Sequence, residues 1–119
     1  MSERIVQLIQ RLTQEIRFAE QRSPADSTEH LEAVVWQKDL ARCCEILREV
    51  LGQPLKDFSQ PTKIDPGLAH AIDQAGGVWD GQCLFCTKED GRSVAYALLW
   101  PWGTDPSRVT LKVGFIEPG

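Results

Sequence analysis

Apolar residues in the first half of the chain recur at steps of three and four. In the first such stretch they stand at Ile5, Ile9, Leu12, Ile16 and Ala19. This spacing lines one face of an α-helix, so we predict a first helix over residues 3–21. The pattern then breaks, and Ser23 precedes Pro24, which disfavours helical backbone at that point.

A second seam of the same kind follows the break. Its members are Ala33, Trp36, Leu40, Cys43, Leu47 and Val50. A helix here would begin near a capping box of Asp26 with Glu29 and would end at Gly52. Two helices with matching seams and a short connection predict an antiparallel helical hairpin over residues 1–52.

The predicted second helix also carries a weaker apolar stripe opposite its main seam. This stripe consists of Leu31, Val34, Val35 and Ile46. A helix that is apolar on two sides needs two packing partners. One partner is the first helix, and the other is the C-terminal half or a second protomer. We therefore expect these four residues at a dimer interface.

Residues 53–77 predict a loop followed by a short helix. The loop, residues 53–63, contains two prolines and has no clear period. The pair Asp65-Pro66 is typical of a helix start, and the pair Gly76-Gly77 is typical of a helix end. Ile72 would lie on the inward face of this helix.

From residue 78 onward the apolar period changes to two, which predicts strands. We place them at residues 82–88, 92–100 and 108–116, with turns at 89–91 and 103–107. The last strand alternates cleanly, because Val109, Leu111 and Val113 share one face while Thr110 and Lys112 share the other. Short connections predict an antiparallel β-meander over residues 78–119.

The predicted fold is therefore α+β, a single domain in which the helical hairpin packs on a three-stranded antiparallel β-meander, with a short connecting helix. Such a sheet has two edges and leaves its reverse face poorly covered. A second copy of the chain would cover this surface, so we expect a homodimer.

Composition limits the classes of function. The chain has 119 residues, of which 42% are hydrophobic and 25% charged, as in a single folded domain. A net charge of −4 argues against a nucleic-acid-binding surface. No apolar stretch approaches the length of a membrane span, and the first residues lack the apolar core of a secretion signal. We therefore expect a cytoplasmic protein that binds neither membrane nor nucleic acid.

The pair Cys83-x-x-Cys86 is the only motif with a recognisable chemical form. Two such thiols can bind zinc or cycle as a dithiol. Side chains three apart on a strand point to opposite faces, however, and no helix follows that would stabilise a thiolate. Cys43-Cys44 diverge by about 100° on a helix, so they do not complete a four-cysteine site. We favour structural cysteines and keep a thiol or zinc site as the alternative.

Trp100-Pro101-Trp102, together with Trp79, is the most unusual surface candidate. Tryptophan is enriched in binding hot spots because it buries a large area and keeps one hydrogen-bond donor. The competing interpretation is packing, with Trp100 in the core and Trp102 covering one end of the sheet. We predict these three tryptophans as contacts to a partner or ligand.

Catalytic candidates are few. His70 and Asp73 would share a helix face, which would let the carboxylate orient the imidazole, whereas His30 and Glu32 would not share one. No nucleophile is attached to either pair. We expect a protein-interaction or adaptor module that acts as a homodimer without a cofactor, and a small-ligand or enzymatic site near His70 remains a weaker alternative.

Overall fold

The computed structural model describes residues 3–24, 29–58, 72–73, 81–88 and 94–116. Its elements are α1 (Glu3–Glu15), β1 (Glu20–Gln21), β2 (Leu31–Trp36), a 3₁₀ turn (Gln37–Asp39), α2 (Leu40–Leu51), β3 (Cys83–Lys88), β4 (Val94–Pro101) and β5 (Arg108–Ile116). The strands form one antiparallel sheet in the order β1-β2-β5-β4-β3. The α+β class is confirmed, but the sheet has five strands instead of three.

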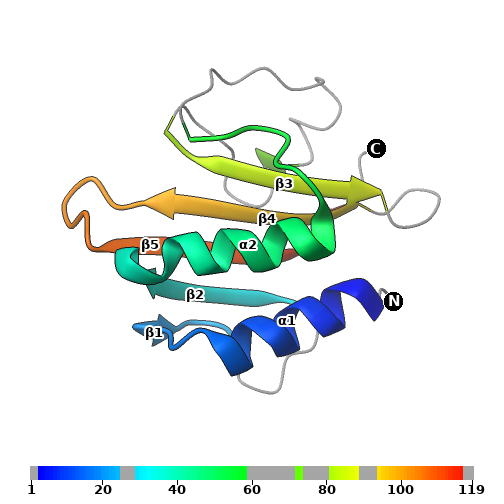
Figure 1. Cartoon of the computed structure of the whole chain (residues 1–119), viewed down its shortest axis with the longest axis horizontal. Helices are drawn as coiled ribbons and strands as arrows, with labels where there is room; N and C mark the ends of the chain where they lie inside the picture. Colours follow the sequence, from blue (N-terminus) through cyan, green and yellow to red (C-terminus); the bar gives the residue numbers. More distant parts are fainter. Residues whose placement is uncertain (1–2, 25–28, 59–71, 74–80, 89–93, 117–119) are drawn as a thin grey trace.

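The two helices lie side by side over one face of the sheet and run in opposite directions (Figure 1). They do not form the predicted hairpin, because β1 and β2 lie between them in the chain. Their seams bury Ile5, Leu8, Ile9 and Leu12 from α1 and Cys43, Ile46, Leu47 and Leu51 from α2. Each large apolar side chain buried in this way contributes about 1.5–3 kcal/mol. This layer between helices and sheet is the main core.

The prediction is wrong at Leu31–Trp36, where the structure has strand β2 in place of a helix. This strand pairs with β5 over its whole length, from Leu31 opposite Val113 to Trp36 opposite Arg108. The run Val34-Val35-Trp36 consists of residue types that fit a pleated sheet better than a helix. Ala33 and Trp36 match the helical period of α2 only by coincidence, since the true seam begins at Leu40.

The first helix is also shorter than predicted. It ends at Glu15 because the chain turns there to pair with β2. The amide of Ala19 donates to the carbonyl of Val34 at 2.7 Å, and the amide of Arg22 donates to that of Glu32 at 2.8 Å. Between them, β1 forms a two-residue edge strand. The sequence carries no helix-stop signal at residue 15, so tertiary pairing decides this boundary.

The predicted meander is present as β3, β4 and β5, and the bounds of β5 match the prediction. β4 lies between β3 and β5, and its side chains from Val94 to Leu99 are buried on both faces of the sheet. Gly52 ends α2 as expected, with φ of 86° and its amide donating to Arg48. The predicted short helix lies outside the described residues except for Ile72 and Asp73, which are helical.

The face of the sheet opposite the helices, called the reverse face below, carries a second apolar cluster. This cluster consists of Ile72, Leu84, Val94, Tyr96 and Leu98, with Cys86 and Trp100 packed against it. The ring of Tyr96 lies over Gly114, where an added Cβ would be 3.4 Å from it. Much of the surface that we expected a second copy to cover is therefore buried within the chain itself.

Candidate functional site

Three strands present polar and aromatic side chains on the reverse face, beside the apolar cluster. Side chains alternate between the two faces along a strand. Trp36 in β2 and Arg108 in β5 are direct partners, and Trp100 in β4 is opposite Thr110 in β5. The register therefore brings residues from widely separated parts of the chain to one surface.

Trp102 extends this surface beyond the end of β4. Its amide donates to the carbonyl of Arg108 at 3.0 Å, which holds the residue beside β5. Its indole Nε1 donates to Oγ1 of Thr110 at 2.8 Å. Thr110 is only 6% exposed, so the indole covers this hydroxyl. The ring thus lies across β5 on the reverse face.

Cationic side chains pack against all three of these tryptophans. The Arg108 guanidinium lies 5.1 Å from the centroid of Trp36 and 5.7 Å from that of Trp102. Arg22 reaches from the β1 edge to within 5.8 Å of the Trp102 centroid, and Lys112 lies 4.9 Å from that of Trp100. Energetically significant cation–π pairs occur about once per 70–80 residues in proteins. Four cation–ring pairs on one face of this chain are therefore more than expected. These six residues are called the array below.

Each cation of the array has an acidic neighbour. Arg22 lies 3.6 Å from Glu20, Arg108 lies 3.3 Å from Asp105, and Lys112 lies 3.9 Å from Glu32. The side chains in these pairs are between 21% and 50% exposed. Three cations and three carboxylates make this surface neutral, although the whole chain carries −4.

The turn that carries Asp105 is fixed by local hydrogen bonds. Oδ1 of Asp105 accepts from the hydroxyl of Ser107 at 2.6 Å and from its amide at 3.1 Å. These bonds, and the charge of Arg108, lower the pKa of Asp105. Within the described residues, Nε of Arg108 is buried without a well-aligned hydrogen bond. The packing of its guanidinium against two indoles therefore contributes to its position.

The structure brings together two of the three predicted tryptophans and adds one that the prediction missed. Trp100 and Trp102 belong to the array, whereas Trp79 lies outside the described residues. Trp36 was assigned to a helical seam, which concealed its place opposite Arg108. Reading residues 32, 34 and 36 as alternating strand positions would have placed it correctly.

The four residues predicted at a dimer interface are buried inside the chain. Leu31, Val35 and Ile46 belong to the main core at 0–1% exposure. Val34 is 0% exposed on the reverse face, between Glu20 of β1 and Thr110 of β5. The helical surface that motivated this interface does not exist, because three of the four residues lie in β2.

The cysteines lie where thiol chemistry is suppressed. Cys83 faces the main core and Cys86 packs against the cluster on the reverse face, so their side chains lie on opposite sides of the sheet. Burial raises the pKa of each to about 12. The pKa of Cys43 in α2 is also raised to about 12 by burial. All four cysteines are free, and the described part of the chain contains no cluster of three metal-binding side chains.

The structure places the first of the two histidine pairs differently from the prediction. Because residues 30–32 are extended, His30 and Glu32 lie on the same face, contrary to the helical expectation. Nδ1 of His30 lies 3.5 Å from the Cβ position of Gly114 on the reverse face. Glu32 is already paired with Lys112 at 3.9 Å. His70 lies outside the described residues.

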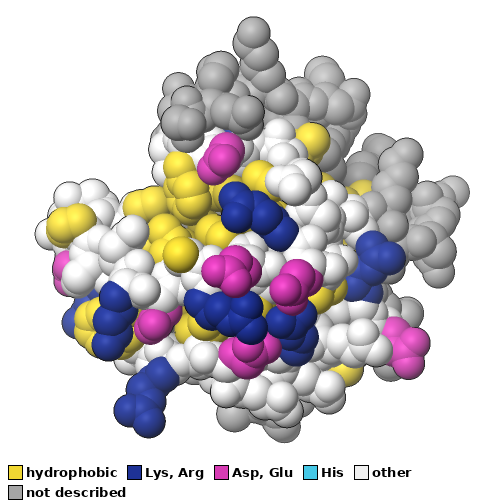
Figure 2. Space-filling view, viewed as in Figure 1, with side chains coloured by type: hydrophobic (Ala, Val, Ile, Leu, Met, Phe, Trp, Pro, Cys, Tyr) yellow, Lys and Arg dark blue, Asp and Glu magenta, His cyan; other side chains and the backbone are white. Residues whose placement is uncertain are grey.

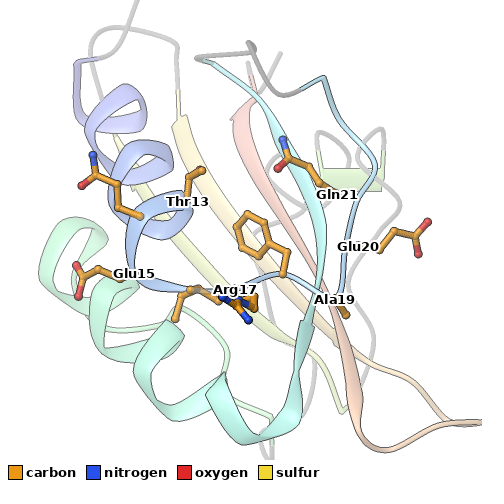
Figure 3. Close-up of a pocket in the computed structure, with 9 residues that line it drawn as sticks. Thr13, Glu15, Arg17, Ala19, Glu20 and Gln21 are labelled. Carbon is orange, nitrogen blue, oxygen red and sulfur yellow. The ribbon is translucent and has the colours of Figure 1, made fainter.

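An open groove of about 670 Å³ lies between the end of α1 and β1. Figure 3 shows Thr13 and Glu15 on α1, Arg17 on the connecting segment, and Glu20 and Gln21 on β1. A single continuous stretch, residues 13–21, lines this groove. Most of its side chains are exposed and polar. We therefore treat the array, and not this groove, as the candidate site.

No protein-family model matches the chain, no curated protein matches it, and no solved structure matches its fold. Across the described residues, no helix combines the length and the apolar character needed to cross a bilayer. The function must therefore be argued from the geometry of the array.

Proposed function

We propose that the chain is a small protein-interaction module and that the array is its docking surface. The observation that supports the proposal most is the packing of three half-buried tryptophans with two arginines and a lysine on one face. Tryptophan and arginine are the residue types most enriched in binding hot spots. They are also enriched in the cores of protein–protein interfaces, with a polar rim around them.

The charges of the array favour a protein partner over a nucleic acid. Each cation already has a carboxylate within 4 Å, so the surface offers no excess positive charge to a phosphate backbone. The acidic chain as a whole would repel such a backbone. We place the module in the cytoplasm, where its four free thiols stay reduced, and assign it no cofactor.

The alternative functions have less support. A zinc or dithiol site at Cys83 and Cys86 would need both sulfurs on one side of the sheet, and they lie on opposite sides. Their burial also withholds the thiolate that either chemistry requires. No described feature supports catalysis near Asp73, the one member of the predicted histidine pair that is described.

Site-specific photo-crosslinking in cells tests the proposal. The variant Thr104→p-benzoylphenylalanine places the reactive group in the exposed turn between Trp102 and Asp105 and leaves the array intact. The matched control, Arg48→p-benzoylphenylalanine, places it on the exposed side of α2. We expect discrete adducts from position 104 that are absent from position 48. Equal labelling from both positions, or none from position 104, would contradict the proposal.

A further inference from the structure

We propose that the array is a self-complementary surface through which two copies of the chain form a reversible dimer. This inference rests on the proposed function and names the partner as a second copy. It differs from the interface expected from the sequence, whose residues are buried in the monomer.

The first support is the arrangement of charge. A two-fold dimer interface is isologous, so the same patch must complement itself. The array meets this condition because each cation stands beside an acid of opposite charge. In the proposed dimer, the two-fold axis through the patch sets the acids of one copy against the cations of the other, so ion pairs within a chain are exchanged for ion pairs between chains. Because the patch is neutral, it adds no local like-charge repulsion between two chains that each carry a net charge of −4.

The second support is the half-buried aromatic surface. A standard interface buries about 800 Å² per partner, roughly a tenth of a small protein's surface. The accessible surface of this chain is 6762 Å². Half-buried indoles supply area at low entropic cost, because their cation–π contacts already hold them in place. The surface thus needs little reorganisation to dock.

The other described surfaces are less suited to a second copy. The β1 edge is a two-residue strand of polar side chains followed by Pro24, which are features that block edge pairing. At the β3 edge, Lys56 pairs with Leu84 through backbone hydrogen bonds. The helices α1 and α2 contain no tryptophan, and their outer side carries ion pairs. Figure 2 shows acidic and basic side chains on this side.

A charge-complementation experiment tests the proposal. The acidic variant carries Arg22→Glu and Lys112→Glu, and the basic variant carries Glu20→Lys and Glu32→Lys. The control carries Arg17→Glu and Arg48→Glu, which changes net charge as much as the acidic variant does but at exposed positions off the array. Sedimentation equilibrium over a concentration series measures the weight-average mass of each variant alone and of the acidic–basic mixture.

We expect the wild-type mass to rise from 13.4 kDa toward twice that value with concentration. The acidic and basic variants should each dimerise at least tenfold more weakly, about 1.4 kcal/mol. An equimolar mixture of the two should dimerise again, and the control should stay within about twofold of wild type. A wild-type chain that is monomeric at every concentration, a control as weak as the acidic variant, or a mixture that stays monomeric would overturn the proposal.

Two further measurements keep these outcomes interpretable. Circular dichroism checks that each variant is folded, and the milder changes Arg22→Gln with Lys112→Gln replace an acidic variant that is not. If the wild type is monomeric while the photo-crosslinker at position 104 captures a different protein, the dimer is wrong and the interaction module stands. If neither occurs, both proposals fail.

Discussion

Lys56 connects the loop after α2 to strand β3 through hydrogen bonds of its side chain and its backbone. It is only 2% exposed, and its ammonium donates to the carbonyls of Gln82 at 2.7 Å and Asp57 at 3.1 Å. Its backbone also exchanges hydrogen bonds with Leu84 of β3. The charge-assisted bonds offset the cost of removing an ammonium group from water. The aliphatic part of the side chain is buried together with the ammonium group.

Lys56→Met should keep that packing and remove the donor. We expect a loss of about 1–3 kcal/mol in the free energy of unfolding, because the buried carbonyl of Gln82 loses a charged donor. Urea denaturation monitored by tryptophan fluorescence measures it. The control Lys38→Met, at an exposed position in the 3₁₀ turn, should change stability by less than about 0.5 kcal/mol. A Lys56→Met chain as stable as wild type would show that desolvation cancels these bonds.

The hydrogen bond between Trp102 and Thr110 is the second residue-scale prediction. Trp102→Phe and Thr110→Val each remove one partner of the 2.8 Å bond, and the double variant removes both. We expect a coupling energy of about 0.5–1.5 kcal/mol from the double-mutant cycle. Each single change should lower the free energy of unfolding by more than the coupling energy. Trp102→Phe leaves the buried Thr110 hydroxyl without its donor and weakens the cation–π contacts, and Thr110→Val leaves the indole Nε1 without its acceptor. A coupling near zero would mean that packing alone holds Trp102 over β5.

At the scale of elements, local signals were sufficient for part of the fold. The clean alternation at Val109, Leu111 and Val113 identified β5 and the face it buries. Gly52 correctly marked the end of α2. Leu31–Trp36 failed because an apolar run that fits both a helical and a strand period is decided by its partner strand, and that partner lies more than 70 residues away. The boundary of α1 failed because pairing with the nearby strand β2 ends the helix, and no local stop signal marks that point.

The candidate site was also predicted only where its residues are marked by the local sequence. Trp100 and Trp102 were found because their composition is unusual at a single point in the sequence. Trp36 and Arg22 were not, since their roles depend on the register of β2 against β5 and of β1 against β2. The sequence could not show that Arg108 and Lys112 of β5, together with Arg22 beside β1, would pack on three indoles. A site assembled across strands becomes visible only when the sheet order is known.

The contact between the helices also belongs to this scale. Arg42 of α2 pairs with Glu15 of α1, and Arg11 pairs with both Glu15 and Glu49, at 3.1 and 2.7 Å. Figure 2 shows acidic and basic side chains alternating across the exposed helices. The hydrogen bonds from Arg42 and Arg11 lower the pKa of Glu15. These ion pairs contribute little to the free energy of unfolding, because they are exposed to solvent and screened by salt.

Glu15→Gln should reveal this contribution through its dependence on pH. A carboxylate whose pKa is lowered on folding stabilises the fold above its unfolded pKa of about 4.3, and that stabilisation is lost as pH falls through the lower folded value. We therefore expect wild type to melt slightly above Glu15→Gln at pH 7, with the difference vanishing in strong acid and shrinking in about 1 M salt. The control Glu29→Gln, at an exposed position outside the network, should show no such difference.

At the scale of the molecule, the chain buries one face of its sheet and part of the other. The helices cover one face, and the cluster around Ile72, Leu84 and Leu98 fills part of the other. Its accessible surface of 6762 Å² is close to the roughly 6,500 Å² expected for a compact monomer of this mass. A second copy is therefore not needed to complete the core. The proposed dimer is a reversible association of folded chains.

The reactivity of the buried thiols measures how completely the folded chain excludes solvent from its core. Burial raises the pKa of Cys43, Cys83 and Cys86 to about 12, so these thiols hold far less thiolate at pH 8 than an unperturbed cysteine does. We expect an aromatic disulfide reagent to label them at least about 100-fold more slowly in the folded chain than in denaturant. The same raised pKa values make the fold lose stability as pH rises above about 8.5, because the thiols of the unfolded chain ionise at a lower pH than those of the folded chain.

Rapid labelling of Cys83 or Cys86 at pH 8, or a higher melting temperature with added zinc, would contradict the buried structural role and support the thiol or zinc function instead.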